Sequence, residues 1–195
     1  MIYAIVLIFS YLLGSIPMGL VLTRLAGRGD LRRMGSGNIG ATNVMRVGGL
    51  RMAGAAWILD MAKVIVSVFV GKYVGGDALG AWCAFVAIFG HCFPIWLRFV
   101  GGKGISGLFG VLLAISPVSF IICGIEWLIV ALGTGYSSAG AIVVMLILPI
   151  LGFVIGAPVG FAFLAISLLC MLRHRENIKR LCNGTESKIV WRWKK

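Results

Sequence analysis

Long apolar runs recur from one end of the chain to the other, and they constrain the fold more than any other feature of the sequence. Of the 195 residues, 60% are hydrophobic and only 12% are charged, a composition typical of membrane proteins. A signal peptide would give one short apolar run followed by a soluble domain, and the sequence lacks that pattern. We therefore expect an all-α integral membrane protein with a single polytopic domain over residues 1–195.

The first half of the chain holds three of the predicted spans. They cover residues 2–22, 52–71 and 78–97. A basic, glycine-rich loop follows the first span, and the short KYVGGD turn at 72–77 separates the second from the third. Pro17 lies within the first span, where it predicts a kink or a carbonyl group satisfied by a neighbouring helix.

The second half is divided by glycine, proline and serine residues. Breaks occur at Ser116-Pro117, Gly133 to Ser138, and Gly156 to Pro158. They predict four helices, of which the first, 105–115, would be about 16 Å long at ~1.5 Å per residue, well short of the ~30 Å hydrocarbon core. We predict seven spans in total, or five if Pro117 and Pro158 only kink longer helices.

The basic residues are unevenly distributed and predict the orientation. The net charge is +12, with six basic residues between Arg24 and Arg51 and eight between Arg173 and Lys195. The positive-inside rule places such segments in the cytoplasm, so the N-terminus is expected outside and the C-terminus inside. The same residues favour contact with anionic lipid headgroups. They form no groove-reading motif, which argues against a nucleic-acid partner.

This topology brings three polar segments to the cytoplasmic side, at residues 35–49, 98–107 and 173–188. The second contains GGKG, Gly101 to Gly104, in which consecutive glycine N–H groups could turn toward one anion while Lys103 adds a full charge. The segment also opens a helix, whose N-terminus favours an anion. The alternative is a tight interfacial turn with a lysine that reaches into the headgroups.

The first segment, GSGNIGATNVMRVGG, joins small hydrogen-bonding side chains to a flexible backbone. Ser36 and Asn38 lie among its glycines, and Asn43 and Arg46 are three residues apart, so on a helix they would share a face. Arginine can bind a phosphate through two parallel hydrogen bonds. A solvated loop facing lipid headgroups is the alternative, but five glycines are not needed in a simple connection.

The third segment, RHRENIKRLCNGTESKI, places His174 and Asn177 at i and i+3, while Glu176 and Arg180 could pair at i and i+4. The alternative is an amphipathic surface helix. Elsewhere, Asp60 and Lys63 are expected to form an ion pair within a span. His91 is expected to be a hydrogen-bonded packing residue.

Several classes of enzyme are excluded. The chain has no paired acidic residues for a metal-dependent phosphotransferase, no His followed five positions later by Asp, and no cysteine in a polar setting. Neither a metal nor a cofactor is expected. Anion-binding groups predominate, so the substrates should carry phosphate and the donor should already be activated.

The three segments, quoted as GSGNIGATNVMRVGG, GHCFPIWLRFVGGKG and RHRENIKRLCNGTESKI, resemble the three cytoplasmic motifs of the bacterial acyl-phosphate:glycerol-3-phosphate acyltransferases, the PlsY family. ILDMAK, Ile58 to Lys63, and GSIPMG, Gly14 to Gly19, extend the resemblance over nearly the whole chain. The resemblance implies transfer of a fatty acyl group from acyl phosphate to the 1-hydroxyl of glycerol 3-phosphate, which yields lysophosphatidic acid and begins phospholipid synthesis.

The resemblance also implies a set of site residues. The catalytic candidates are Ser36, Asn38, Lys103 and His174, and the substrate-binding candidates are Asn43, Arg46, Gly101, Gly102, Gly104, Ser138 and Asn177. Ser36 and Asn38 would orient the donor, whereas Arg46, His174 and Asn177 would hold glycerol 3-phosphate. A donor phosphate oxygen would take the hydroxyl proton, and His174 as the base is the rival hypothesis. The chain departs from the family pattern at Gly107, where threonine is usual, and at Gly135, where arginine is usual.

The resemblance implies a location and partners as well. We expect a multi-pass protein of the bacterial cytoplasmic membrane, with its active site facing the cytoplasm. Its expected partners are acyl phosphate, glycerol 3-phosphate, membrane lipids and the enzyme that makes acyl phosphate. An organophosphate or phosphate transporter is the alternative from another class, although no internal repeat is visible. An inactive membrane paralogue is the third interpretation.

Overall fold

The computed structural model describes residues 1–189, and every regular element in that range is helical, as the sequence predicts. The elements are α1 (Ile2–Gly14), α2 (Met18–Leu25), η1 (Leu31–Arg33), α3 (Ala41–Gly48), α4 (Leu50–Cys92), η2 (Ile95–Leu97), α5 (Ile105–Ile115), α6 (Pro117–Thr134), α7 (Ser137–Ile155), α8 (Ala157–Arg173) and α9 (Arg175–Cys182). The basic residues at 192, 194 and 195 lie outside the described range.

Helix α4 is a hairpin of two packed arms. Its 43 residues lose helical geometry at Gly75 and Gly76, within the predicted KYVGGD turn, and Gly76 has a φ of 75° that favours glycine. A Cβ atom at Gly71 would lie 2.8 Å from the Cα atom of Gly80, so the arms approach too closely for any side chain there. The turn therefore separates the second predicted span from the third.

The first predicted span is broken rather than gently kinked. Helix α1 ends at Gly14 and α2 begins at Met18, with Pro17 at its N-cap. The carbonyl oxygen of Ile16 accepts a hydrogen bond of 2.8 Å from Nζ of Lys63 in α4. A neighbouring helix thus satisfies the backbone that proline disrupts.

The predicted breaks in the second half are helix boundaries. Ser116 caps α6 by accepting a hydrogen bond from the N–H group of Ser119, and Pro117 occupies the first turn. Gly135 ends α6 with a φ of 80°, and Gly156 separates α7 from α8. The third predicted span, 78–97, is too long at its C-terminal end, because α4 stops at Cys92 and a turn containing Pro94 follows.

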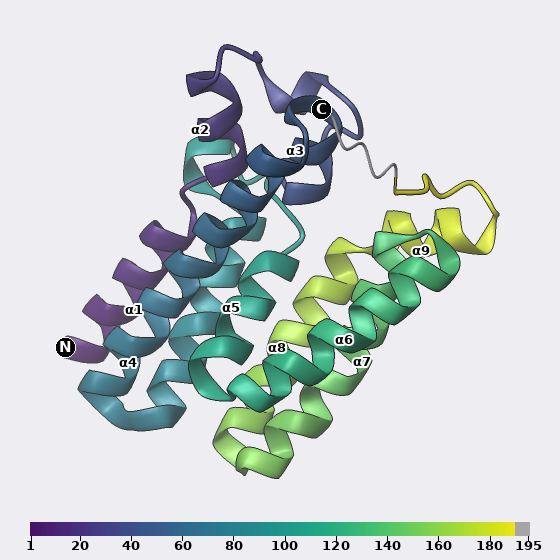
Figure 1. Ribbon diagram of the computed structural model, residues 1–195. Helices are drawn as coiled ribbons and strands as arrows, with labels where there is room; N and C mark the ends of the chain where they lie inside the picture. Colours follow the sequence, from purple (N-terminus) through teal and green to yellow (C-terminus); the bar gives the residue numbers. More distant parts are fainter. Residues whose placement is uncertain (190–195) are drawn as a thin grey trace.

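Figure 1 shows how the elements are arranged. Helices α1, α4 and α5 lie together on one side, and α6, α7 and α8 lie on the other. A shared core of buried aliphatic side chains, including Val64, Ile88, Leu108, Val144 and Phe163, joins the two groups. The N-terminus and the α4 hairpin turn lie at one end of the molecule, whereas α2, α3 and α9 lie at the opposite end. The three polar segments are therefore collected at one end.

The helices are long and apolar enough to cross a membrane. By length and composition, residues 2–25, 50–97, 117–134 and 137–155 each qualify among those described. Helix α8 reaches the required length only together with α9, to which it is bent by 58°. The expectation of an integral membrane protein is consistent with these lengths.

Candidate functional site

The side chain of Asn43 forms hydrogen bonds to several backbone groups of the first polar segment. Its side chain is 1% exposed, and its amide nitrogen lies 2.9 Å from the carbonyl oxygen of Met34 and 2.8 Å from that of Asn38. Its side-chain oxygen accepts from the N–H group of Ser36 at 2.9 Å. Asn43 therefore shapes the loop from inside. It does not share a surface with Arg46, which is exposed one turn later in α3.

The remaining candidates of this segment lie on the loop that Asn43 organises. Ser36 is exposed, and Asn38 is half-buried with its side-chain oxygen accepting from the N–H group of Gly40 at 2.8 Å. The hydroxyl groups of Thr42 and Ser137 lie 3.5 Å apart. The segment is thus tied to the start of α7, one residue before Ser138.

The backbone of Gly101 and Gly102 is held from both sides. Their N–H groups donate to the carbonyl oxygens of Cys92 and His91 at 3.1 and 3.0 Å. Their own carbonyl oxygens accept from the guanidinium group of Arg173 at 2.9 and 3.1 Å. These two N–H groups are therefore not free to face an anion, which corrects the expectation of a glycine nest here. Among residues 1–189, no such bond is formed by the N–H groups of Gly104, Ile105, Ser106 and Gly107.

Lys103 connects the second polar segment to the third. Its ammonium group donates a short hydrogen bond to the side-chain oxygen of Asn177. The amide nitrogen of Asn177 and the hydroxyl group of Ser138 both donate to one oxygen of Glu186, at 2.7 and 2.9 Å. Arg180 donates to the other oxygen of Glu186 at 2.6 Å. Five side chains from three parts of the sequence thus form one network.

His174 lies at the bend between α8 and α9 and is 4% exposed. Its Nδ1 atom lies 2.8 Å from the carbonyl oxygen of Cys170, so Nδ1 carries the proton and Nε2 is left as an acceptor. Burial, as the largest cause, lowers the pKa of His174 to about 4. The imidazole is therefore neutral at pH 7.

The site carries a strong positive potential. Burial and then the nearby charge of Arg180 lower the pKa of Lys103 to about 8, and Arg46 and Arg173 act in the same direction. The carboxylate of Glu186 acts against them, and its own pKa is lowered by the hydrogen bonds from Asn177 and Arg180 although burial opposes this. The charges of Arg46, Arg173 and Arg180 act on Lys103 against the single carboxylate of Glu186, and this excess of positive charge suits a phosphate-bearing ligand.

The two departures from the expected pattern have structural explanations. A Cβ atom at Gly107 would lie 2.9 Å from Cγ1 of Ile88 and 3.1 Å from Cγ2 of Val64, so position 107 faces the core. The missing threonine is thus not a missing ligand here. Gly135 ends α6, and its carbonyl oxygen accepts from the N–H group of Ile189 at 2.8 Å. Position 135 therefore anchors the C-terminal segment.

Sequence reasoning missed three residues of the site, namely Arg173, Arg180 and Glu186. The predicted pair of Glu176 with Arg180 is wrong, because Arg180 pairs with Glu186 instead. The turn at Asn183-Gly184 brings Glu186 back under α9. Glu186 lies between the basic residues Arg180 and Lys188, and this was the available signal that it has a cationic partner.

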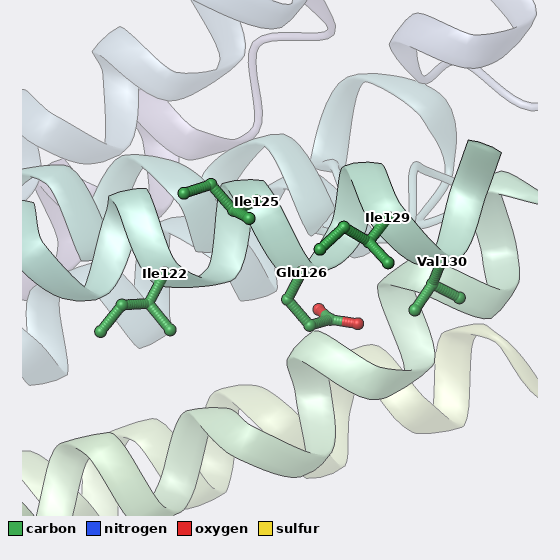
Figure 2. A pocket seen from close by; sticks show the side chains of 5 residues that line it. All are labelled: Ile122, Ile125, Glu126, Ile129 and Val130. Atoms are coloured by element: carbon green, nitrogen blue, oxygen red, sulfur yellow. The ribbon is translucent and has the colours of Figure 1, made fainter. Parts of the chain in front are cut away.

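An apolar groove on α6 lies apart from this site. Figure 2 shows that Ile122, Ile125, Ile129 and Val130 line it together with Glu126. The oxygens of Glu126 have no hydrogen-bond partner among residues 1–189. None of the candidate site residues lines the groove.

Comparisons with known proteins agree with the motifs. The sequence profile of the glycerol-3-phosphate acyltransferase family matches residues 4–184. A glycerol-3-phosphate acyltransferase of Rhizobium etli is 44% identical over 183 residues, covering 93% of this chain and 89% of that protein. One from Brucella abortus is 47% identical over 184 residues, covering 94% and 91%. The chain belongs to the glycerol-3-phosphate acyltransferase family.

Solved structures of the family agree with the fold. The integral membrane glycerol 3-phosphate acyltransferase PlsY, in its glycerol 3-phosphate form, superimposes with a TM-score of 0.92 at 34% identity over 97% of this chain and 96% of that one. Its lysophosphatidic acid form gives 0.91 at 32% identity, over 98% and 97%. The resemblance drawn from the three segments is therefore confirmed, and the transporter alternative is not supported.

Proposed function

We propose that the chain transfers a fatty acyl group from acyl phosphate to the 1-hydroxyl group of glycerol 3-phosphate, and that its site is the network around Lys103. The hydroxyl oxygen forms an ester bond to the acyl carbon, the bond from that carbon to the phosphate oxygen breaks, and the released phosphate takes the proton. The observation that carries the proposal is the link from Lys103 through Asn177 to Glu186 and Ser138. That link joins side chains from two of the three motifs and from the start of α7.

Different groups of the proposed site bind the two substrates. Two phosphate-bearing molecules repel each other, so the site must neutralise both before they can react. Arg46 and Lys103 supply free positive charge, and Asn177, Ser138 and the Nε2 acceptor of His174 supply hydrogen bonds for glycerol 3-phosphate. Ser36 and Asn38, on the opposite loop, would orient the acyl phosphate.

Two groups near Lys103 complete the proposed site. Gly104 precedes α5 with a φ of 85°, and the N–H groups of Ile105, Ser106 and Gly107 have no intrahelical acceptor and are available to an anion. Gly101 and Gly102 shape the loop through their backbones, and Asn43 shapes the other loop. These three residues support the site without offering a free side chain to the substrate.

When the hydroxyl group of glycerol 3-phosphate attacks, another group must accept its proton. Glu186 is occupied by three donors. His174 has a pKa of about 4 and so gives little driving force for proton transfer. A phosphate oxygen of the donor lies on the reacting group itself and can take the proton directly. Holding the two substrates in line then provides most of the catalysis.

The path of the chain supports seven crossings. The α1–α2 pair, the two arms of α4, and α5, α6, α7 and α8 run alternately between the two ends of the molecule (Figure 1). The short helix α5 is compatible with a locally thinned bilayer. With the basic segments in the cytoplasm, the N-terminus lies outside and the site opens to the cytoplasm. The protein would then reside in the bacterial cytoplasmic membrane and receive acyl phosphate from the enzyme that makes it.

The test is a direct assay in a lipidic matrix. Purified protein receives palmitoyl phosphate and glycerol 3-phosphate, and phosphate release and lysophosphatidic acid are followed by mass spectrometry. The proposal requires turnover that depends on both substrates and falls by about 100-fold or more in Lys103→Ala and Ser36→Ala. Folded protein without turnover would instead identify an inactive paralogue.

A further inference from the structure

A cluster of three buried polar side chains lies beneath the glycine loop. Asp60 and Lys63 come from the first arm of α4 and His91 from the end of the second, and they are 1%, 3% and 5% exposed. The carboxylate of Asp60 lies 2.7 Å from Nζ of Lys63, which forms the predicted ion pair. Burying charges in a membrane span is costly, so such groups are retained for a purpose.

The ammonium group of Lys63 has three polar neighbours, and Nδ1 of His91 also lies 3.5 Å from a carboxylate oxygen of Asp60. The neighbours of the ammonium group are the Asp60 carboxylate, the carbonyl oxygen of Ile16 at 2.8 Å and Nδ1 of His91 at 3.1 Å. Because an ammonium group can only donate, Nδ1 of His91 must accept. The cluster thus joins the α1–α2 break to both arms of α4 and fixes the orientation of the His91 ring.

His91 in turn contacts the loop that bears Lys103. The backbone carbonyl oxygen of His91 accepts from the N–H group of Gly102 at 3.0 Å. A Cβ atom at Gly102 would overlap with Nε2 of the imidazole, so the ring packs directly against the bare α carbon. His91 therefore supports Gly102 through both its backbone and its side chain, one residue before Lys103.

We propose that Asp60, Lys63 and His91 are positioning residues. The hydrogen bond from Lys63 to His91 fixes the end of α4, whose His91 carbonyl oxygen holds Gly102, so that Lys103 meets glycerol 3-phosphate. This proposal builds on the assignment of Lys103 to the site. None of the three need touch a substrate. A displacement of the loop by a fraction of an ångström would move the Lys103 ammonium away from both Asn177 and the ligand.

The test compares two substitutions of one residue. His91→Asn keeps an acceptor near the position of Nδ1, whereas His91→Leu is of similar size but offers no acceptor and leaves one Lys63 proton unpaired. We expect His91→Leu to raise KM for glycerol 3-phosphate about tenfold with a smaller change in kcat, and His91→Asn to stay within about threefold of the parent. If His91→Leu does not fold, His91→Gln replaces it, because its amide reaches the Nε2 position and leaves the Nδ1 position without an acceptor.

A matched control measures the cost of losing any buried hydrogen bond in α4. Ser67 donates to the carbonyl oxygen of Lys63 at 2.9 Å and forms no hydrogen bond to the loop within residues 1–189, so Ser67→Ala should leave KM unchanged. Equal KM values for His91→Asn and His91→Leu, or a loss confined to thermal stability, would overturn the proposal.

Titration calorimetry with glycerol 3-phosphate alone separates this proposal from the proposed reaction. Binding that weakens in His91→Leu but not in His91→Asn supports the positioning role even if the protein shows no turnover. Binding that is equal in both variants contradicts it even if the acyltransferase assay succeeds.

Discussion

The ammonium group of Lys103 donates a hydrogen bond to the side-chain oxygen of Asn177, which lies 74 positions further along the sequence. Asn177 cannot donate through that oxygen, so its amide group points the opposite way and donates to Glu186. The bond thus fixes both the orientation of the amide and the position of the lysine. A substrate phosphate that enters the site would compete with Asn177 for the protons of Lys103.

Lys103 should control the alkaline limb of the pH profile. Its pKa is lowered to about 8, chiefly by burial, so the positive charge is present below that pH and is lost above it. We expect kcat/KM for glycerol 3-phosphate to fall about tenfold per pH unit above about pH 8.5. Lys103→Arg, whose guanidinium stays charged, should shift this limb upward. The measurement is the initial rate from pH 6 to 10, corrected for uncatalysed hydrolysis of palmitoyl phosphate; a flat profile in the unsubstituted protein would contradict the role.

His174 should bind substrate rather than remove a proton. With a pKa lowered to about 4 by burial, it is neutral throughout the working pH range, and Nε2 can accept a hydrogen bond from the glycerol hydroxyl. We expect His174→Asn, whose amide reaches the Nδ1 position and leaves no acceptor at the Nε2 position, to raise KM for glycerol 3-phosphate about tenfold, the cost of one hydrogen bond. The shape of the kcat profile with pH should not change. Loss of an acidic limb in kcat would instead assign His174 as the general base.

We expect that activity requires an arginine at position 173 and that a lysine cannot replace it. Its guanidinium bridges the carbonyl oxygens of Gly101 and Gly102, and a lysine has a single nitrogen that cannot reproduce the fork. We expect Arg173→Lys to lower kcat/KM about tenfold and Arg173→Ala to lower it further.

The neighbouring Arg175 provides the control for this substitution. It is exposed and lies 3.7 Å from Glu176, so Arg175→Ala should change kcat/KM less than about twofold. Activity that falls equally in the Arg173 and Arg175 variants would point to a general loss of positive charge rather than to the bridge.

Gly107→Thr should weaken the fold and should not improve catalysis. A side chain at 107 meets Ile88 and Val64 in the core, and overpacking of this kind costs about 1–3 kcal/mol. Adding Ile88→Ala removes the overlapping Cγ1 atom and should recover part of the loss. Thermal unfolding of the two single variants and the double variant measures the coupling. Higher activity in Gly107→Thr without loss of stability would return position 107 to the phosphate site.

The sequence by itself determined the helices and their ends. The predicted segment 105–115 coincides with α5, and the breaks near Ser116, Gly135 and Gly156 are all helix boundaries. The Asp60–Lys63 ion pair was also predictable. These features depend on hydrophobic runs, on local turn chemistry and on neighbours three residues apart in one helix. All of these are short-range patterns that can be recognised directly in the sequence.

The motifs also predicted which residues gather at the candidate site, because seven alternating spans would bring three polar segments to one face. The number of spans stays a prediction. Lys103 and Asn177 were predicted from their residue types and spacing, and Ser138 from the family resemblance, without knowledge of their contacts.

Only the tertiary structure decided what each group contacts. Arg180 could have paired with Glu176, but the backbone turn after α9 places Glu186 closer. The N–H groups of Gly101 and Gly102 could have faced an anion, but the carbonyl groups of His91 and Cys92 take them. Hydrogen bonds act over about 3 Å, so their partners depend on how segments far apart in the chain are packed, which local sequence patterns do not specify.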